Sequence, residues 1–373
     1  MIRSDKARTS SQEPHMQQVI RSFDDVTPDW LNGTLGLDPA TVSSCRITRE
    51  WDTVTTRVAL VRLDYKVVQP GNPTSVFIKL SKQDATQELK KLCAREVLFY
   101  SRIAGLMPGQ CIPRCYLAVH EQEDNDFCIV LEDLSQTHFQ TEYPVPLSLS
   151  WCRRALTCLA QIHAAGWSHG ELEPALGGFT TQESIEHWSD LSRKAWKEFS
   201  LFLGDRLADG RRRIIVEVMD NFNQVLGRGL KTAQLTVLHR DAHLWNFFFP
   251  LEEQGDVKLF DWQLCEYGLA ADDLVPLMAL NWFPERRSRF EKVLLKEYHS
   301  ALSGAGVEGY SLKELETEYR WSVLKGIGTP LWQWYHKVPA WIWFNNLEKI
   351  LLAVEDLSCM ELLRRKVGHA ASH

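Results

Sequence analysis

The stretch LHRDAHLWNFFFP, residues 238–250, decides the fold of this chain. It places His239, Asp241 and Asn246 directly before three consecutive phenylalanines. The apolar residues on either side of this polar group are typical of two β-strands. Polar, titratable side chains between two strands indicate a functional loop, because such residues concentrate on loops that a rigid scaffold holds in place.

A second strand returns the chain to this loop. The turn sequence LEEQGD, residues 251–256, connects the phenylalanines to the strand VKLFDW at residues 257–262. This spacing predicts a tight hairpin that brings Asp261 beside Asn246. The phenylalanines anchor the hairpin in the core and hold the loop rigid.

The pattern His239-x-Asp241-x4-Asn246, followed by a hairpin and Asp261, is typical of metal-assisted phosphoryl transfer in kinases. A hydroxyl nucleophile must be oriented and its proton accepted, which the carboxylate of Asp241 can do. Mg²⁺ neutralises phosphoryl charge and prefers hard oxygen ligands, such as the amide of Asn246 and the carboxylate of Asp261. The pattern therefore predicts Mg²⁺ and a nucleoside triphosphate as cofactors; we expect ATP, and the choice between ATP and GTP stays open.

Two residues upstream fit the same chemistry. Lys79 lies near the end of the expected strand SVFIKL at residues 75–80, and Glu96 lies on an expected helix at residues 84–103. Kinases use a strand lysine held by a helix glutamate to bind the α- and β-phosphates. A strand lysine alone is more often a solvated residue at a sheet edge, so the order of all these residues along the chain carries the interpretation.

Composition and charge limit the classes of function. The chain has 373 residues, 45% of them hydrophobic, as in a soluble globular protein. A net charge of −6 and a pI near 6.1 argue against a nucleic-acid partner. No apolar run approaches the roughly 20 residues of a membrane span, and the polar N-terminus is unlike a signal peptide. Nine cysteines without zinc-ligand spacing favour a reduced, cytoplasmic, soluble protein, and we expect no membrane partner.

Local patterns predict an α+β protein. Residues 57–68 alternate apolar and polar side chains, and with the strand at 75–80 they form a hairpin across the turn QPGNP. Further strands are expected at 116–122 and 127–134, whereas helices dominate from Leu147 onward. These helices are expected at residues 149–165, 183–203, 211–230, 286–303 and 345–366.

This distribution predicts two lobes. We expect a mobile tail at residues 1–24, then a small antiparallel, β-rich N-lobe that binds nucleotide at 25–133. A larger helical C-lobe at 134–373 would hold the catalytic loop and the acceptor site. The oligomeric state stays open.

The chain resembles the aminoglycoside phosphotransferase and choline kinase-like superfamily, and most closely its ecdysteroid kinase-like branch. The resemblance rests on the segments VTPDWLNGTL, FIKL, AREVLFYSRI, CIVLEDLS, VLHRDAHLWNFFF and VKLFDWQLCEYGLAADDL, in family order from residue 26 to 274. It implies a protein-kinase-like two-lobed fold and an ATP-dependent small-molecule kinase. It says little about which small molecule is the acceptor.

The resemblance implies a role for each matching residue. Asp241 would be the catalytic base, and Asn246 and Asp261 would hold Mg²⁺. Lys79 would contact the ATP phosphates, and Glu96 would orient Lys79.

Backbone groups would supply further nucleotide contacts. The segment LEDL would be the hinge between the lobes, where adenine pairs with the main chain of Glu132 and Leu134. Family members usually carry a glycine in the phosphate-covering loop, whereas the corresponding loop here, residues 49–56, has none. Its backbone amides and threonine hydroxyls are the alternative ligands for phosphate.

Other positions also depart from the family pattern. Many relatives have glycine where this chain has Arg240, and Trp262 stands where protein kinases carry phenylalanine. His243 is extra, and we expect a hydrogen-bonded loop histidine rather than a substrate contact. For Asp272 and Asp273 we expect helix N-capping, with contact to a cationic substrate or to the catalytic loop as the alternative.

The segment TPLWQWYHKVPAWIWFNN, residues 329–346, bears on the acceptor. Its aromatic residues follow no single helical stripe and two prolines interrupt it, so we expect an irregular backbone that lines a cavity. It has no carboxylate for a polycationic aminoglycoside. We therefore expect a bulky, largely apolar alcohol as acceptor. A choline-like amine held by cation–π contacts and an aminoglycoside are the alternatives.

Two competing functions remain. A catalytically inert kinase fold that acts as a scaffold is disfavoured, because Lys79, Asp241 and Asp261 are all present. A protein kinase is disfavoured because no recognisable activation loop follows Asp261. The enzyme interpretation, a kinase that phosphorylates the hydroxyl of a small molecule, is favoured.

Overall fold

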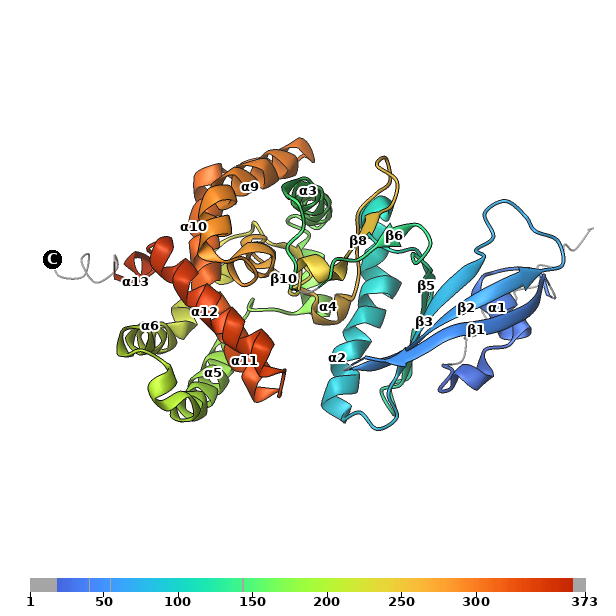
Figure 1. The fold of residues 1–373 in the computed structure, drawn as a ribbon, viewed down its shortest axis with the longest axis horizontal. Helices are drawn as coiled ribbons and strands as arrows, with labels where there is room; N and C mark the ends of the chain where they lie inside the picture. The colour runs from blue at the N-terminus through green and yellow to red at the C-terminus, as the bar shows by residue number, and fades with distance from the viewer. Residues whose placement is uncertain (1–18, 40, 54, 143, 365–373) are drawn as a thin grey trace, which may run out of the picture. The chain divides into compact units, whose positions relative to one another are not determined.

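The computed structural model describes residues 19–364 apart from residues 40, 54 and 143 (Figure 1). The chain divides into two compact units, which are described separately. Unit 1 comprises Met1–Lys90 and Cys115–Glu132, and unit 2 comprises Lys91–Arg114 and Asp133–His373.

Unit 1 is built on a five-stranded antiparallel sheet with the order β1-β2-β3-β5-β4. The predicted hairpin is confirmed, because β2 pairs with β3 from Thr56 opposite Ser81 to Arg62 opposite Ser75. The strands are β1 (Val42–Asp52), β2 (Thr56–Tyr65), β3 (Ser75–Ser81), β4 (Cys115–His120) and β5 (Phe127–Glu132).

A hydrophobic core packs one face of this sheet against helix α1 (Pro28–Thr34) (Figure 1). Thr27 caps α1 by accepting a hydrogen bond from the backbone N–H of Trp30 at 3.2 Å, and Pro28 occupies the first helical position. Ile20 and Phe23 also lie in this core. The expected tail is thus anchored to the core by these two residues, while its remaining part, residues 1–18, lies outside the described residues.

Helix α2 (Gln87–Leu98) spans the division between the units and continues as a π-helical turn, Phe99–Ile103. Its first part is tied to unit 1 by a buried ion pair between Lys90 and Asp126 at 2.7 Å. Its second part packs in unit 2, where the ring of Phe99 stacks on Trp262 with centroids 3.8 Å apart.

Unit 2 is mainly helical, as predicted. Helix α3 packs beside α9, and α11 packs against both α5 and α12 (Figure 1). The longer helices are α3 (Leu149–Ala165), α5 (Gln182–Leu203), α6 (Asp209–Asp220), α9 (Pro284–Gly304), α10 (Leu312–Gly326), α11 (Gly328–Tyr335) and α12 (Ala340–Asp356), and the shorter ones are α4 (Glu173–Leu176), α7 (Phe222–Leu226), α8 (Ala271–Leu274) and α13 (Glu361–Arg364).

Short strands in unit 2 hold the polar loop. Strand β7 (Thr236–Leu238) leads into it and β8 (Phe247–Pro250) leads out of it. β8 pairs with β6 (His138–Phe139) and with β9 (Lys258–Leu259), which confirms the hairpin expected from the FFF and VKLFDW segments. β7 pairs with β10 (Glu266–Gly268).

The tryptophan-rich segment differs from expectation. It forms two helices, α11 and α12, joined by a short link, rather than an irregular backbone. Trp334 and Trp343 pack on Phe199 of α5, with ring centroids 5.0 and 5.5 Å away. These two tryptophans therefore belong to the core between helices.

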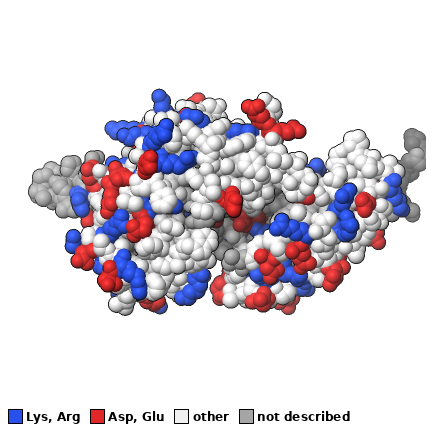
Figure 2. Space-filling model, viewed as in Figure 1, with Lys and Arg blue, Asp and Glu red and all other residues white. Residues whose placement is uncertain are grey.

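The surface carries both signs of charge. On the face shown in Figure 2, lysine and arginine side chains lie near aspartate and glutamate side chains in several patches, with uncharged surface between them. Among the described residues, none of the helices has both the length and the apolar character needed to cross a bilayer.

Candidate active site

The polar loop is folded around its own side chains. The amide Nδ2 of Asn246 donates to the backbone oxygen of Asp241 at 2.9 Å and to its carboxylate Oδ2 at 3.2 Å. The N–H of Phe260 donates to the backbone oxygen of Asn246 at 3.1 Å, and Nε2 of buried His239 lies 2.8 Å from the backbone oxygen of Phe260. The loop is thus joined to the strand that precedes Asp261.

Asp261 has an unusual backbone conformation. Its φ is +69°, in the left-handed region that residues other than glycine seldom adopt. The next residue, Trp262, is fully buried and donates from Nε1 to the backbone oxygen of Leu259 at 3.1 Å. Its ring stacks on Phe99 and meets His239 edge-on at 4.7 Å. Trp262 therefore fills the core behind the loop.

The buried carboxylate of Asp273 holds the backbone of the loop. Its carboxylate accepts hydrogen bonds from the backbone N–H groups of His239 and Arg240, both at 2.7 Å. Nε2 of His163, a buried residue of α3, lies 3.2 Å from the same carboxylate. The expected N-capping role is wrong, because Ala270 occupies the cap position of α8 and makes no side-chain bond, whereas contact with the loop at residues 239–246 is confirmed.

Electrostatics keep Asp241 ionised. Partial burial raises the pKa of Asp241, but the charge and hydrogen bond of His243, with a contribution from His239, outweigh it and lower the pKa to about 2. His243 Nε2 lies 3.4 Å from Asp241 Oδ2. Burial lowers the pKa of His243, whereas the carboxylate of Asp241 raises it more, so the net shift is upward. The Asp241 side chain is 40% exposed, so a ligand can reach its carboxylate.

Lys79 and Glu96 occupy the elements expected for them. Lys79 is buried in the middle of β3, opposite Val58 and Ile129 of the neighbouring strands. Glu96 is buried on α2. The two residues belong to different units, so their pairing stays a prediction.

The expected adenine contacts lie where the sheet ends. Glu132 is the last residue of β5 and lies opposite Val76 in the register. Leu134 is buried, and its carbonyl accepts hydrogen bonds from the N–H groups of Thr137 and His138 at 3.1 and 2.9 Å. Adenine binding at these two positions stays a prediction.

The loop without glycine is shorter than expected. Residues 49–52 belong to β1 and Thr56 begins β2, so the described turn consists of little more than Thr53 and Thr55. The hydroxyl of Thr53 accepts from the N–H of Thr56 at 2.9 Å and lies 2.9 Å from the Thr56 hydroxyl. Two of the threonine hydroxyls considered as phosphate ligands are therefore engaged within the turn itself.

The donor set beside Asp241 suits Mg²⁺. The amide nitrogen of Asn246 faces Asp241, which directs its amide oxygen to the other side of the side chain. Asp261 follows the strand that is hydrogen-bonded to Asn246, and its charge acts on both His239 and His243. An amide oxygen and a carboxylate are hard ligands of the kind that Mg²⁺ prefers. The residues present therefore fit the ion.

Sequence reasoning missed part of this site. The anchoring contact of His163 with Asp273 joins residues 110 positions apart. Arg240 also forms side-chain ion pairs with Glu266 and Asp272. The sequence signal for these contacts was the acidic pair Asp272 and Asp273. Helix N-capping explained that pair equally well.

Comparison with protein families gives a match over most of the chain. The model of the ecdysteroid kinase-like family matches residues 52–305. No curated protein sequence matches the chain significantly.

Solved structures show the same fold at low sequence identity. An ethanolamine kinase from Plasmodium vivax superposes with a TM-score of 0.52 at 13% identity, covering 91% of this chain and 88% of that one. The GDP complex of wild-type aminoglycoside 2′-phosphotransferase-IIIa gives 0.53 at 11% identity, with 84% and 94% covered. The GDP and kanamycin complex of APH(2″)-IIIa gives 0.52 at 10% identity, with 90% and 95% covered. The predicted α+β, protein-kinase-like fold is thus confirmed.

Proposed function

The chain belongs to the ecdysteroid kinase-like family, and we propose that it is an ATP- and Mg²⁺-dependent kinase that phosphorylates a hydroxyl group of a small-molecule alcohol. The observation that carries the proposal is the loop in which Asn246 orients the ionised, accessible carboxylate of Asp241. Asp273 holds this loop by accepting hydrogen bonds from the backbone N–H groups of His239 and Arg240.

Asp241 orients the acceptor and receives its proton. The acceptor hydroxyl donates a hydrogen bond to the Asp241 carboxylate, and its oxygen attacks the γ-phosphorus of ATP as ADP leaves. The proton passes to the carboxylate as the new phosphate ester forms. A carboxylate with a pKa of about 2 is a weak base, so orientation of the hydroxyl is the larger contribution.

Asn246 and Asp261 would hold Mg²⁺ beside Asp241. When bound, the ion neutralises the charge of the phosphates. The bond from Asn246 Nδ2 to Asp241 ties the orientation of the amide to that of the base. Both side chains therefore depend on the same fold of the loop.

The remaining contacts would hold the nucleotide. We assign ATP phosphates to Lys79, oriented by Glu96, and adenine to the backbone of Glu132 and Leu134. The N-lobe at 25–133 would thus bind nucleotide, and the C-lobe at 134–373 would bind the acceptor. GDP complexes of relatives with this fold support nucleotide binding in general.

The acceptor is proposed to be a bulky, largely apolar alcohol. Helices α11 and α12 carry aromatic side chains that remain half exposed: Trp332 at 41%, Tyr335 at 54%, Trp341 at 56% and Phe344 at 39%. Large exposed apolar side chains on neighbouring helices favour binding of an apolar ligand. We propose these exposed aromatic side chains, in place of the expected cavity, as the contacts for the acceptor.

A panel of acceptors tests the proposal. ATP consumption is measured with hydroxylated steroids or terpenoids, choline and kanamycin, each with Mg²⁺ and with excess chelator. We expect Mg²⁺-dependent turnover with an apolar alcohol. Efficient turnover of kanamycin alone would contradict the proposed acceptor class, and ATP binding without turnover of any acceptor would favour the scaffold alternative.

A further inference from the structure

Arg240, the residue between His239 and Asp241, has an unusual main chain. Its φ is +70°, in the left-handed region where side chains with a Cβ are disfavoured. A large, charged residue at such a position persists only when its surroundings hold it there. The contacts of the Arg240 side chain therefore identify what holds the catalytic loop in shape.

The guanidinium of Arg240 is held by two acidic residues from the segment after Asp261. Its Nε lies 2.8 Å from Oε1 of Glu266, on β10, and its Nη1 lies 3.7 Å from Oδ2 of Asp272, on α8. Burial lowers the pKa of Arg240, but these carboxylates outweigh burial and raise it. The arginine is therefore a permanent cation at this position.

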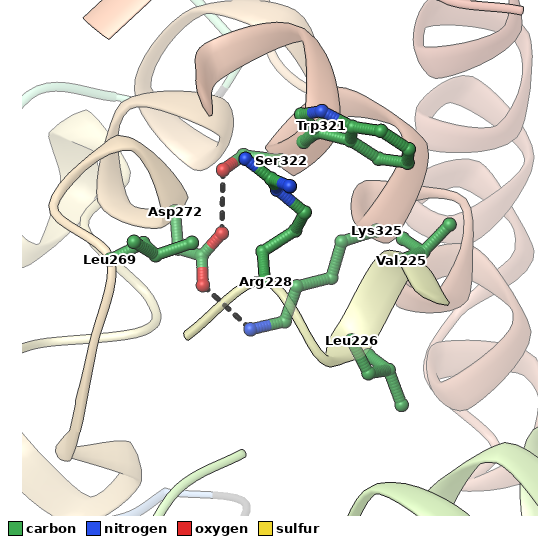
Figure 3. Close-up of a pocket in the computed structure, with 8 residues that line it drawn as sticks. All are labelled: Val225, Leu226, Arg228, Leu269, Asp272, Trp321, Ser322 and Lys325. Carbon is green, nitrogen blue, oxygen red and sulfur yellow. Dashed lines mark hydrogen bonds and ion pairs between the residues drawn. The ribbon is translucent and has the colours of Figure 1, made fainter. Parts of the chain in front are cut away.

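A second cation, from α10, completes the group. Nζ of Lys325 lies 2.6 Å from Asp272 Oδ2 and 3.8 Å from Glu266 Oε1, and the hydroxyl of Ser322 donates to Asp272 Oδ1 at 2.6 Å. Figure 3 shows the Asp272 carboxylate between Ser322 and Lys325, with both contacts drawn. Two cations and two acids thus join α10, α8 and β10 to the catalytic loop.

The cluster is largely shielded from water. The side chains of Glu266, Asp272 and Lys325 are 13%, 4% and 12% exposed, and that of Arg240 is 25% exposed. Removing one partner from a buried ion pair is strongly unfavourable, because the other charge is left without compensation. Such a group resists rearrangement far more than a surface ion pair does.

We propose that Arg240 is a positioning residue, which keeps the carboxylate of Asp241 in place through a buried charge cluster with Glu266, Asp272 and Lys325. The kinetic part of this inference rests on the proposed kinase function. The structural part, that the cluster keeps the loop in shape, does not depend on any activity.

The kinetic test compares R240M and R240K with wild type. R240M removes the positive charge and nearly preserves the length of the side chain. We expect kcat to fall by roughly 10–100-fold, while the KM for ATP changes little. A small displacement of the Asp241 carboxylate from the reacting atoms has an effect of this size on the rate. R240K should recover part of the lost kcat. Equal kcat values for R240M and wild type would overturn the proposal.

A double variant tests the pairing with Glu266. R240M leaves the Glu266 carboxylate without its nearest cation, so adding E266Q should restore loop order rather than harm it further. Additive losses in the double variant would indicate two independent structural roles and would contradict the cluster.

Amide hydrogen exchange of the full chain gives a readout that needs no activity. We expect R240M to exchange the amides of residues 239–246 at least tenfold faster than wild type. R211M is the matched control, since Arg211 of α6 is similarly exposed at 22% and also pairs with two acids, Glu348 and Glu355 of α12. Unchanged exchange at 239–246 in R240M, or equal acceleration there in R211M, would refute the positioning role even if no kinase activity were found.

Discussion

Replacement of Asp273 by asparagine tests how the catalytic loop is supported. The carboxylate is fully buried and accepts two backbone hydrogen bonds, from His239 and Arg240, beside its contact with His163. Asparagine keeps one oxygen acceptor but turns an amide N–H₂ group toward a second donor. D273N therefore leaves at least one buried N–H group without an acceptor.

The expected loss of stability in D273N follows from this missing hydrogen bond. A hydrogen bond to a charged group contributes about 1.5–3 kcal/mol, so D273N should lose about that much stability. Because domains are stable by about 5–15 kcal/mol, the variant should stay folded at 25 °C. Its kcat should fall by roughly 100-fold, since the loop that carries Asp241 loses its anchor.

The stability that the Asp273 carboxylate contributes depends on pH in a defined direction. Burial raises the pKa of Asp273, but the hydrogen bond and charge of His163, with those of His239, outweigh it and lower the pKa. A carboxyl group with a lowered pKa stabilises the fold above its unfolded value, near 3.9, and this stability is lost as the pH falls through the folded value. The stability difference between wild type and D273N should therefore shrink below about pH 4.

Denaturant unfolding and steady-state kinetics measure the two effects. E291Q is the matched control, because Glu291 is also a buried carboxylate, but its bonds run to side chains of α9 and α10, Arg287 at 3.2 Å and Tyr319 at 2.8 Å, rather than to the loop backbone. We expect E291Q to lose stability but keep its kcat per folded molecule. An unchanged kcat in D273N, or an equal kcat loss in E291Q, would refute the anchoring role.

Further variants separate the other roles. D241N should keep the fold and ATP binding while kcat falls by roughly 10²–10⁴-fold, and wild-type turnover in a folded variant would exclude Asp241 from the mechanism. D261A should weaken calorimetric binding of ATP with Mg²⁺ far more than that of adenosine, and equal losses would indicate a structural role. K79M should show the same preference less completely, because one charge on the phosphates is lost while the metal ligands remain. W332A should raise the KM for an apolar alcohol roughly tenfold without changing that for ATP, and an unchanged KM would place the acceptor elsewhere.

Short-range patterns predicted the elements of the loop well. The alternation in β2, the apolar run of β8 and the turn at residues 251–256 each follow from a few neighbouring residues, and the structure forms the expected hairpins. The contact of Asn246 with Asp241 could also be anticipated, because both lie within one short loop.

The tryptophan-rich segment shows where a pattern misleads. Its two prolines mark helix starts rather than irregular backbone, since Pro330 lies in the first turn of α11 and Pro339 is the N-cap of α12. No single helical stripe covers the aromatic residues because they belong to two helices. The period could be recognised only by treating the two helices separately.

Contacts distant in sequence could not be derived from local rules. The ion pair of Arg240 with Glu266 depends on the pairing of β7 with β10, which places Leu238 opposite Glu266. Strand β1 was also difficult to predict from the sequence, because most of its side chains are exposed and its alternation of apolar and polar residues is weak. In both cases tertiary pairing decides the structure.

The central claim is phosphoryl transfer to an alcohol that depends on Asp241. Phosphorus NMR of the wild-type protein and of D241N, each with ATP, Mg²⁺ and a hydroxylated apolar acceptor, measures it directly. We expect a phosphate ester signal to grow in step with ADP in the wild-type sample, with little or none in the D241N sample over the same time. Equal ester formation by both proteins, or ATP binding without any ester from the wild type, would contradict the account.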